Sequence, residues 1–173
     1  KTPETATSMQ TNATYSGNIS SSSDEDWYSF ELAQPGNVSV TFSHSSGTSS
    51  NDYWTVYLYN SSGDTYYQTW EIPLNDGSFT FHEGLPAGSY LLRVTDNSYT
   101  TRWQYQLELA FEPSDFYEQT PNESRGQALA IPTRSHHFGR LSSYSDEDWF
   151  LFDLPETAEV AIHLSHTRSD YSH

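Results

Sequence analysis

Acidic side chains at two places in the chain have the spacing to bind a divalent cation. Residues 24–26 read Asp-Glu-Asp after a run of serines, and residues 146–148 repeat the same three residue types. Carboxylates this close together repel one another, so a folded protein keeps them on a solvated turn or neutralises them with a cation. Both clusters come directly before a segment with strand-like alternation, and this repetition makes the two interpretations about equally strong.

Other residues with catalytic potential lack suitable partners. His163 and His166 are three residues apart at a predicted strand and point to opposite faces, and His136 and His137 have no partner nearby. The chain contains no Cys and no Gly-x-Ser-x-Gly motif. We therefore expect a protein that is not an enzyme.

Aromatic residues suggest a second kind of site. Several lie on or beside one predicted strand pair, namely Tyr57, Tyr59, Tyr66, Tyr67 and Trp70. Tyr and Trp on a flat sheet face suit stacking on sugar rings or packing on a protein fibre. The alternative is that they form ordinary cross-strand pairs or cover a neighbouring module.

The elements that position these residues occur in a repeat. Shifting the chain by 122 positions aligns residues 1–51 with 123–173 without a gap, and sixteen of the 51 pairs are identical. This predicts a complete module at residues 1–111, a linker at 112–122 and the first part of a second module at 123–173.

Alternating apolar and polar residues predict strands throughout the chain and no helix. The turn at Pro35 and Gly36 suggests that the strands on either side of it form a hairpin. The pattern favours an all-β fold, an antiparallel β-sandwich of jelly-roll type. The expected strands are residues 14–20, 26–33, 38–43, 53–59, 65–72, 78–81, 89–95, 102–111 and 158–165.

The second module has too few predicted strands to bury its inner face. Either the natural protein continues beyond His173, which we expect, or a neighbouring chain supplies the missing strands, as in strand-donation assemblies.

Charge limits the possible partners. The chain has 173 residues and a formal charge of −16, from 23 acidic and 7 basic side chains. A nucleic-acid partner is not expected, since its phosphates call for a basic surface. No apolar stretch of about 18 residues exists, so we expect no membrane insertion.

The chain resembles the bacterial pre-peptidase C-terminal domain family, which includes the collagen-binding domains of clostridial collagenases. The resemblance implies a jelly-roll sandwich that is secreted or on the cell surface, usually appended to hydrolases. The matching segments, which cover most of residues 13–110, are Asp24-Glu25-Asp26-Trp27-Tyr28-Ser29-Phe30, Pro35-Gly36, Val56-Tyr57-Leu58-Tyr59-Asn60-Ser61-Ser62-Gly63, Gly84-Leu85-Pro86-Ala87-Gly88-Ser89-Tyr90 and Tyr105-Gln106-Leu107.

Some members of this family bind calcium between an acidic opening segment and the acidic turn. In the second module the resemblance assigns this role to Glu118, Asn122, Glu123, Asp146 and Asp148, although Gln119 and Thr120 are inserted relative to the tighter family pattern. In the first module only Asp24 and Asp26 are present, because its opening segment would precede Lys1. All are oxygen donors of the kind calcium prefers.

We therefore expect a non-catalytic, extracellular adhesion or substrate-attachment module from a tandem array, made rigid by calcium at the joint. Its partner would be an extracellular protein fibre, a polysaccharide or neighbouring copies of itself. Two alternatives stay open at this point. One is a C-terminal targeting or processing appendage of a secreted protease or glycosidase, and the other is a structural subunit of a surface filament or layer completed by neighbouring chains.

Overall fold

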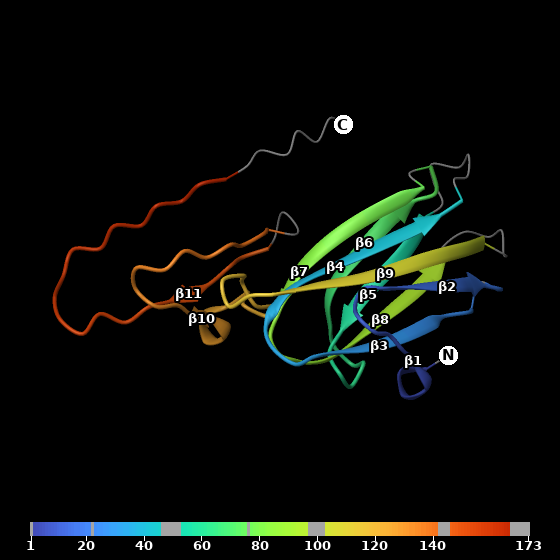
Figure 1. The fold of residues 1–173 in the computed structure, drawn as a ribbon, viewed down its shortest axis with the longest axis horizontal. Coiled ribbons are helices and arrows are strands. Elements are labelled where there is room, and N and C mark those ends of the chain that lie inside the picture. Colours follow the sequence, from blue (N-terminus) through green and yellow to red (C-terminus); the bar gives the residue numbers. More distant parts are fainter. Residues whose placement is uncertain are drawn as a thin grey trace.

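Two β-sheets packed face to face make up most of the chain. The computed structural model describes residues 2–21, 23–45, 53–75, 77–96, 103–141 and 146–166. The described residues that follow the sandwich extend from one end of it (Figure 1). The predicted all-β sandwich is confirmed, and the jelly-roll detail stays a prediction. Helical structure among the described residues is confined to short turns, none long enough to cross a bilayer.

The first sheet has the strand order β1-β3-β8-β5-β6. The short strand β1 runs parallel to β3, and the other neighbours are antiparallel. A 3-10 turn, η1, precedes β1. The bounds are η1 Pro3–Thr5, β1 Thr7–Ser8, β3 Asp26–Leu32, β5 Tyr53–Tyr59, β6 Tyr66–Pro73 and β8 Gly88–Asp96.

The second sheet has the antiparallel order β2-β9-β4-β7. Its strands are β2 Ala13–Ile19, β4 Gly36–His44, β7 Ser78–Leu85 and β9 Trp103–Pro113. Because β3 and β4 belong to different sheets, the predicted hairpin around Pro35 is wrong. An alternating pattern shows that a strand has a buried face, but it does not show which strand lies beside it.

The core lies between the two sheets and is rich in aromatic side chains. Phe42, Trp54 and Tyr105 meet there, with ring centroids 5.3 Å apart in each pair. All three are at most 1% exposed. Replacing one such ring by Ala typically costs about 3–5 kcal/mol of stability, so this cluster fixes the two sheets to each other.

The backbone after the sandwich repeats the way the chain begins. The turn η2 (Arg125–Gln127) precedes β10 (Leu129–Ala130), which pairs in parallel with β11 (Phe150–Leu151). In the first copy the Met9 amide donates to Ser29 at 2.7 Å, and 122 positions later Ile131 donates to Leu151 at 2.8 Å. The two segments therefore share their local geometry.

The strand expected at residues 158–165 is not present: residues 157–166 belong to no strand. Its counterpart β4 is paired on both sides, with β7 and β9. Within the described residues the second copy has no counterparts of these two partners, so its backbone lacks a ladder to join.

Candidate functional site

The segment between the sandwich and the second copy, residues 114–122, is bound to the sandwich on one side. We call it the joint segment. The Ser114 amide donates to the Pro35 carbonyl at 3.0 Å, and the Thr120 amide donates to the Gly84 carbonyl at 3.0 Å. The Thr120 hydroxyl also donates to the carboxylate of Glu83, at the end of β7.

Gly84 allows this close approach. A Cβ at this position would overlap the carbonyl oxygen of Glu118, so any larger residue would push the joint segment away from β7. The joint segment is therefore fitted to the end of the sandwich and does not hang free of it.

The same segment is also bound to the second copy. The Glu118 amide donates to the Phe138 carbonyl at 2.8 Å, and the Trp149 amide donates to the Asn122 carbonyl at 3.0 Å. Glu118, Thr120 and Asn122 are 6%, 4% and 2% exposed. These three alternate residues of the joint segment connect the sandwich to the second copy, and all three are almost completely buried.

Two carboxylates meet beside this segment. A Cβ at Gly139 would lie 2.8 Å from Glu118 Oε2 and 3.4 Å from Asp148 Oδ2, so both carboxylates border the same glycine. Glu118 Oε1 accepts from the Arg140 amide at 2.7 Å, and Asp148 Oδ1 accepts from Asn122 Nδ2 at 3.1 Å. Among the described residues, Glu118 Oε2 is buried and receives no hydrogen bond from an N–H or hydroxyl group, and its polar neighbour is the carboxyl group of Asp148.

The electrostatics of these groups favour a bound cation. Burial, followed by the neighbouring Asp148, raises the pKa of Glu118. Burial also raises the pKa of Asp148, and the charge of Asp146 adds to it. Each carboxylate is therefore held in surroundings that disfavour its negative charge, which a cation would relieve.

Glu83 belongs to the same group of charges, and the sequence analysis missed it. Burial raises the pKa of Glu83 to about 7, and the charges of Asp146 and Glu123 act in the same direction. The hydrogen bond from Thr120 and the charge of Arg140 oppose this shift. An acid from the sandwich thus interacts with acids of the second copy.

The donors present are of the type that calcium takes, but they supply only part of its six to eight oxygen ligands. Glu118 and Asp148 supply carboxylate oxygens, while Asp146 and the exposed Glu123 lie nearby. Asn122 faces Asp148 through its amide nitrogen, which donates a hydrogen bond, so its amide oxygen would be the atom that binds a cation. Within the described residues no three acidic or imidazole side chains converge into a complete ligand set. Backbone carbonyls and water would therefore have to complete the calcium shell.

The first copy uses its acidic residues differently. Asp24 Oδ2 accepts from the Ser20 amide at 2.8 Å and hydroxyl at 2.7 Å, and these bonds lower the pKa of Asp24. Asp26 is 8% exposed and accepts from the Tyr105 hydroxyl at 2.7 Å. Both carboxylates therefore take part in the structure of the sandwich itself.

The structure divides the predicted aromatic face between the two sides of the first sheet. Tyr57, Tyr59 and Tyr66 form a triad on the outer side, with centroids 5.9–6.1 Å apart. Tyr66 is 58% exposed, whereas Tyr59 is only 8% exposed. We call these three residues the tyrosine triad.

Tyr67 and Trp70 pack against the core and not beside the triad. Trp70 stacks on Phe81 with centroids 3.9 Å apart. The pairing of β5 with β6 is irregular between Leu58 and Tyr59, and Tyr67 is the extra residue. Such a bulge reverses the side to which a residue points, which the sequence pattern concealed.

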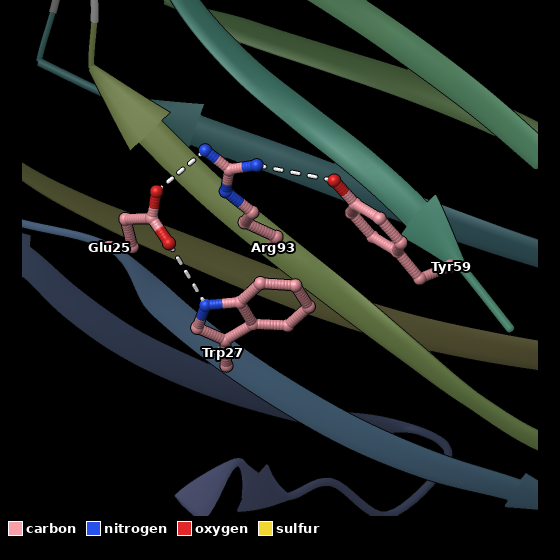
Figure 2. A network of polar contacts seen from close by, with 4 residues as sticks. All are labelled: Glu25, Trp27, Tyr59 and Arg93. Carbon is pink, nitrogen blue, oxygen red and sulfur yellow. Dashed lines mark hydrogen bonds and ion pairs between the residues drawn. The ribbon is translucent and has the colours of Figure 1, made fainter. Parts of the chain in front are cut away.

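One basic residue, Arg93, contacts two members of the tyrosine triad. Figure 2 shows Arg93 between Glu25 and Tyr59, with hydrogen bonds of 2.6 and 3.2 Å. Its guanidinium also lies over the rings of Tyr57 and Trp27, at 5.0 and 5.8 Å.

Glu25 completes this network by accepting from Trp27 Nε1 at 3.2 Å (Figure 2). The equivalent bond in the second copy, from Trp149 to Glu147, has the same length. The middle acid of each cluster is thus bound to the Trp that follows it, and in the first copy it is also paired with Arg93.

Comparison with known proteins agrees, for the central part of the sandwich, with the family resemblance seen in the sequence. Residues 24–96 match the family model of the bacterial pre-peptidase C-terminal domain. The resemblance inferred from the sequence is therefore supported for this part of the chain, and the tandem copies stay a prediction.

One solved structure supports the fold. The pre-peptidase C-terminal domain of collagenase from Bacillus anthracis superposes with a TM-score of 0.51 and 21% identity, covering 63% of this chain and 98% of that one. Two weaker similarities are to the Yersinia pseudotuberculosis-derived mitogen (TM-score 0.41, 19% identity, 62% and 90% covered) and to a carbohydrate-binding module of Cellvibrio mixtus lichenase 5A (0.36, 16%, 58% and 88%). No curated protein sequence matches the chain.

Proposed function

We propose that the sandwich is a non-catalytic attachment module of a secreted protein, and that it binds an extracellular protein fibre through the tyrosine triad. The match of residues 24–96 to pre-peptidase C-terminal domains supports this proposal, because such domains are accessory parts of secreted proteases. The comparisons indicate no catalytic family.

The observation that carries the proposal is an exposed tyrosine beside side chains that are held by hydrogen-bond and cation–π contacts. Tyr66 is 58% exposed, and Tyr57 is held beneath Arg93. Tyr and Arg are the side chains that most often dominate the binding energy of protein interfaces. Here both occur on one sheet face of an acidic protein.

The ring geometry favours a protein partner over a polysaccharide. Sugar rings stack best on a flat aromatic platform, but Tyr66 is tilted by 74° to Tyr57 and by 71° to Tyr59. Edges, faces and hydroxyl groups are therefore presented together, which suits an irregular protein surface better than a row of sugars.

We also propose that the second copy is the start of a tandem module and that calcium makes the joint rigid. The repeated backbone pairing and the convergence of Glu118, Asn122 and Asp148 support this part. It is tested by melting the chain with calcium and with a chelator. Calcium should raise the melting temperature, and an unchanged curve would contradict it.

Attachment is tested by retention on insoluble collagen, chitin and cellulose. We expect the wild type to be retained on collagen and both Tyr66→Ser and Tyr57→Ser to be lost from it, with far-ultraviolet circular dichroism unchanged. Phe116→Ser is the control, since Phe116 is 54% exposed at the joint, away from the triad. Equal retention of all variants would exclude the triad, and retention on chitin or cellulose alone would show that the partner class is wrong.

A further inference from the structure

We propose that a cation at the joint holds the sandwich and the following segment in a fixed arrangement. Thr120 and Glu83 are the positioning residues, which connect the cation ligands to the sandwich. The inference rests on the proposed calcium site. Thr120 and Glu83 are not proposed as metal ligands, and neither the repeat nor the family resemblance assigns them a role.

The order of contacts along the joint segment is the first argument. Glu118 and Asn122 contact the second copy through Phe138, Asp148 and Trp149. Thr120 lies between them in sequence and is bound to the sandwich by two hydrogen bonds, to Gly84 and Glu83. The ligands on both sides of Thr120 therefore cannot shift unless Thr120 shifts as well.

Burial makes this connection stiff. Glu83 is 8% exposed and Thr120 is 4% exposed, between Glu118 at 6% and Asn122 at 2%. Gly84 leaves no space between β7 and the Glu118 carbonyl. Closely packed groups have few alternative arrangements, so a displacement of the ligands is passed on to β7 and is not absorbed locally.

Electrostatic repulsion between acidic residues explains why the joint should depend on a cation. The buried carboxylate of Glu83 belongs to the sandwich, and the charges of Glu123 and Asp146 that act on it belong to the second copy. Without a cation these charges repel the ionised form of Glu83 across the joint. A divalent cation between them reverses the sign of the interaction, so it should close a joint that repulsion otherwise loosens.

The position of Glu83 in the sequence shows that this contact lies between two bodies. The repeat relates residues 1–51 to 123–173, and Glu83 lies outside both ranges. Glu83 therefore comes from the sandwich and lies outside the aligned part of the repeat.

The test is calorimetric titration of calcium into the full chain and its variants. Thr120→Val removes the bond to Glu83 but leaves Glu118, Asn122 and Asp148 in place. We expect it to bind calcium about tenfold more weakly, which corresponds to ~1.4 kcal/mol. Thr120→Ser keeps a hydroxyl and should bind like the wild type, which separates a lost bond from a misfolded chain.

The matched control is Thr133→Val, because Thr133 is exposed after the second copy's β10. It should leave calcium affinity unchanged. Glu83→Gln should weaken binding as Thr120→Val does, because it removes the charge on the sandwich side of the joint.

The outcomes separate the two proposals. If the wild type binds calcium and Thr120→Val binds it equally well, the connection through Thr120 is refuted while the calcium site stands. If the wild type itself shows no binding, the calcium site is refuted and the connection with it.

Discussion

Two aspartates that occupy equivalent positions in the repeat should respond in opposite ways to the same substitution. Asp26 and Asp148 are 122 residues apart, and each directly precedes a Trp. Asp26 accepts a hydrogen bond from Tyr105 within the sandwich, whereas Asp148 lies beside Glu118 at the joint. Replacing either by Asn keeps the shape of the side chain and removes its charge.

The size of the effect follows from binding linkage. A calcium concentration about 100 times the dissociation constant stabilises the wild type by about 2.7 kcal/mol. For a chain of this size that corresponds to a rise in melting temperature of roughly 5–11 °C. If Asp148→Asn weakens binding about tenfold, the same calcium concentration gives about 1.4 kcal/mol, or roughly 3–6 °C.

Asp26→Asn should show the reverse pattern. Its melting temperature should fall in calcium and in chelator alike, because the Tyr105 hydroxyl loses a charged acceptor, and the calcium increment should equal that of the wild type. The assay is differential scanning calorimetry of the three proteins in both buffers. If Asp26→Asn reduced the calcium increment as much as Asp148→Asn, the assignment of these two roles would be refuted.

Further predictions concern the sandwich alone. Tyr105→Phe should lower the free energy of unfolding by about 1.5–3 kcal/mol in urea titration, because a buried bond to the Asp26 carboxylate is lost; a change below ~0.5 kcal/mol would contradict this. Trp70→Ser should cost about 2–3 kcal/mol in the same assay and Tyr66→Ser less than ~1, because only Trp70 stacks on the core; equal costs would count against the placement of Trp70. Burial raises the pKa of Tyr90 from 10.0 to about 12, so the unfolded chain releases this proton first and stability should fall as pH rises between 10 and 12. The slope in that window should be smaller in Tyr90→Phe, and identical slopes would argue against the shift.

Local patterns predict the strands well, but they do not predict how the strands are arranged. The alternation in Val38, Val40 and Phe42 marks a buried face, and the structure confirms it. Whether β4 pairs with β3 or crosses to the other sheet depends on contacts with β7 and β9, which lie about 40–70 residues further on. The sequence around Pro35 contains no information about those partners.

A single extra residue was enough to mislead the prediction of the aromatic face. In a regular strand Tyr66 would share a face with Trp70, four residues on, but the bulge at Tyr67 places Tyr66 opposite Tyr59 on the outer side of the sheet. The local pattern does not reveal the bulge, because a bulge is selected by packing across the whole sheet.

The candidate cation site was predictable to the extent that its residues lie in recognisable segments. Glu118, Asn122 and Asp148 were identified through the family resemblance, and the structure brings them together. Glu83 and Arg93 were missed, because a lone charged residue in a strand does not reveal its partner. A useful signal exists for Arg93, which is a charged residue directly after two leucines and before a valine in a strand and therefore requires a compensating contact.

The most direct test of the joint is amide hydrogen exchange measured with calcium and with a chelator. The amides of Glu118, Thr120 and Trp149 bond to Phe138, Gly84 and Asn122 respectively, so together they report both sides of the joint. At a calcium concentration about 100 times the dissociation constant, all three should exchange roughly a hundredfold more slowly than in chelator. The Met9 amide, which bonds within the sandwich, should be unaffected. Equal exchange of the three joint amides in both buffers would contradict a joint that calcium holds closed.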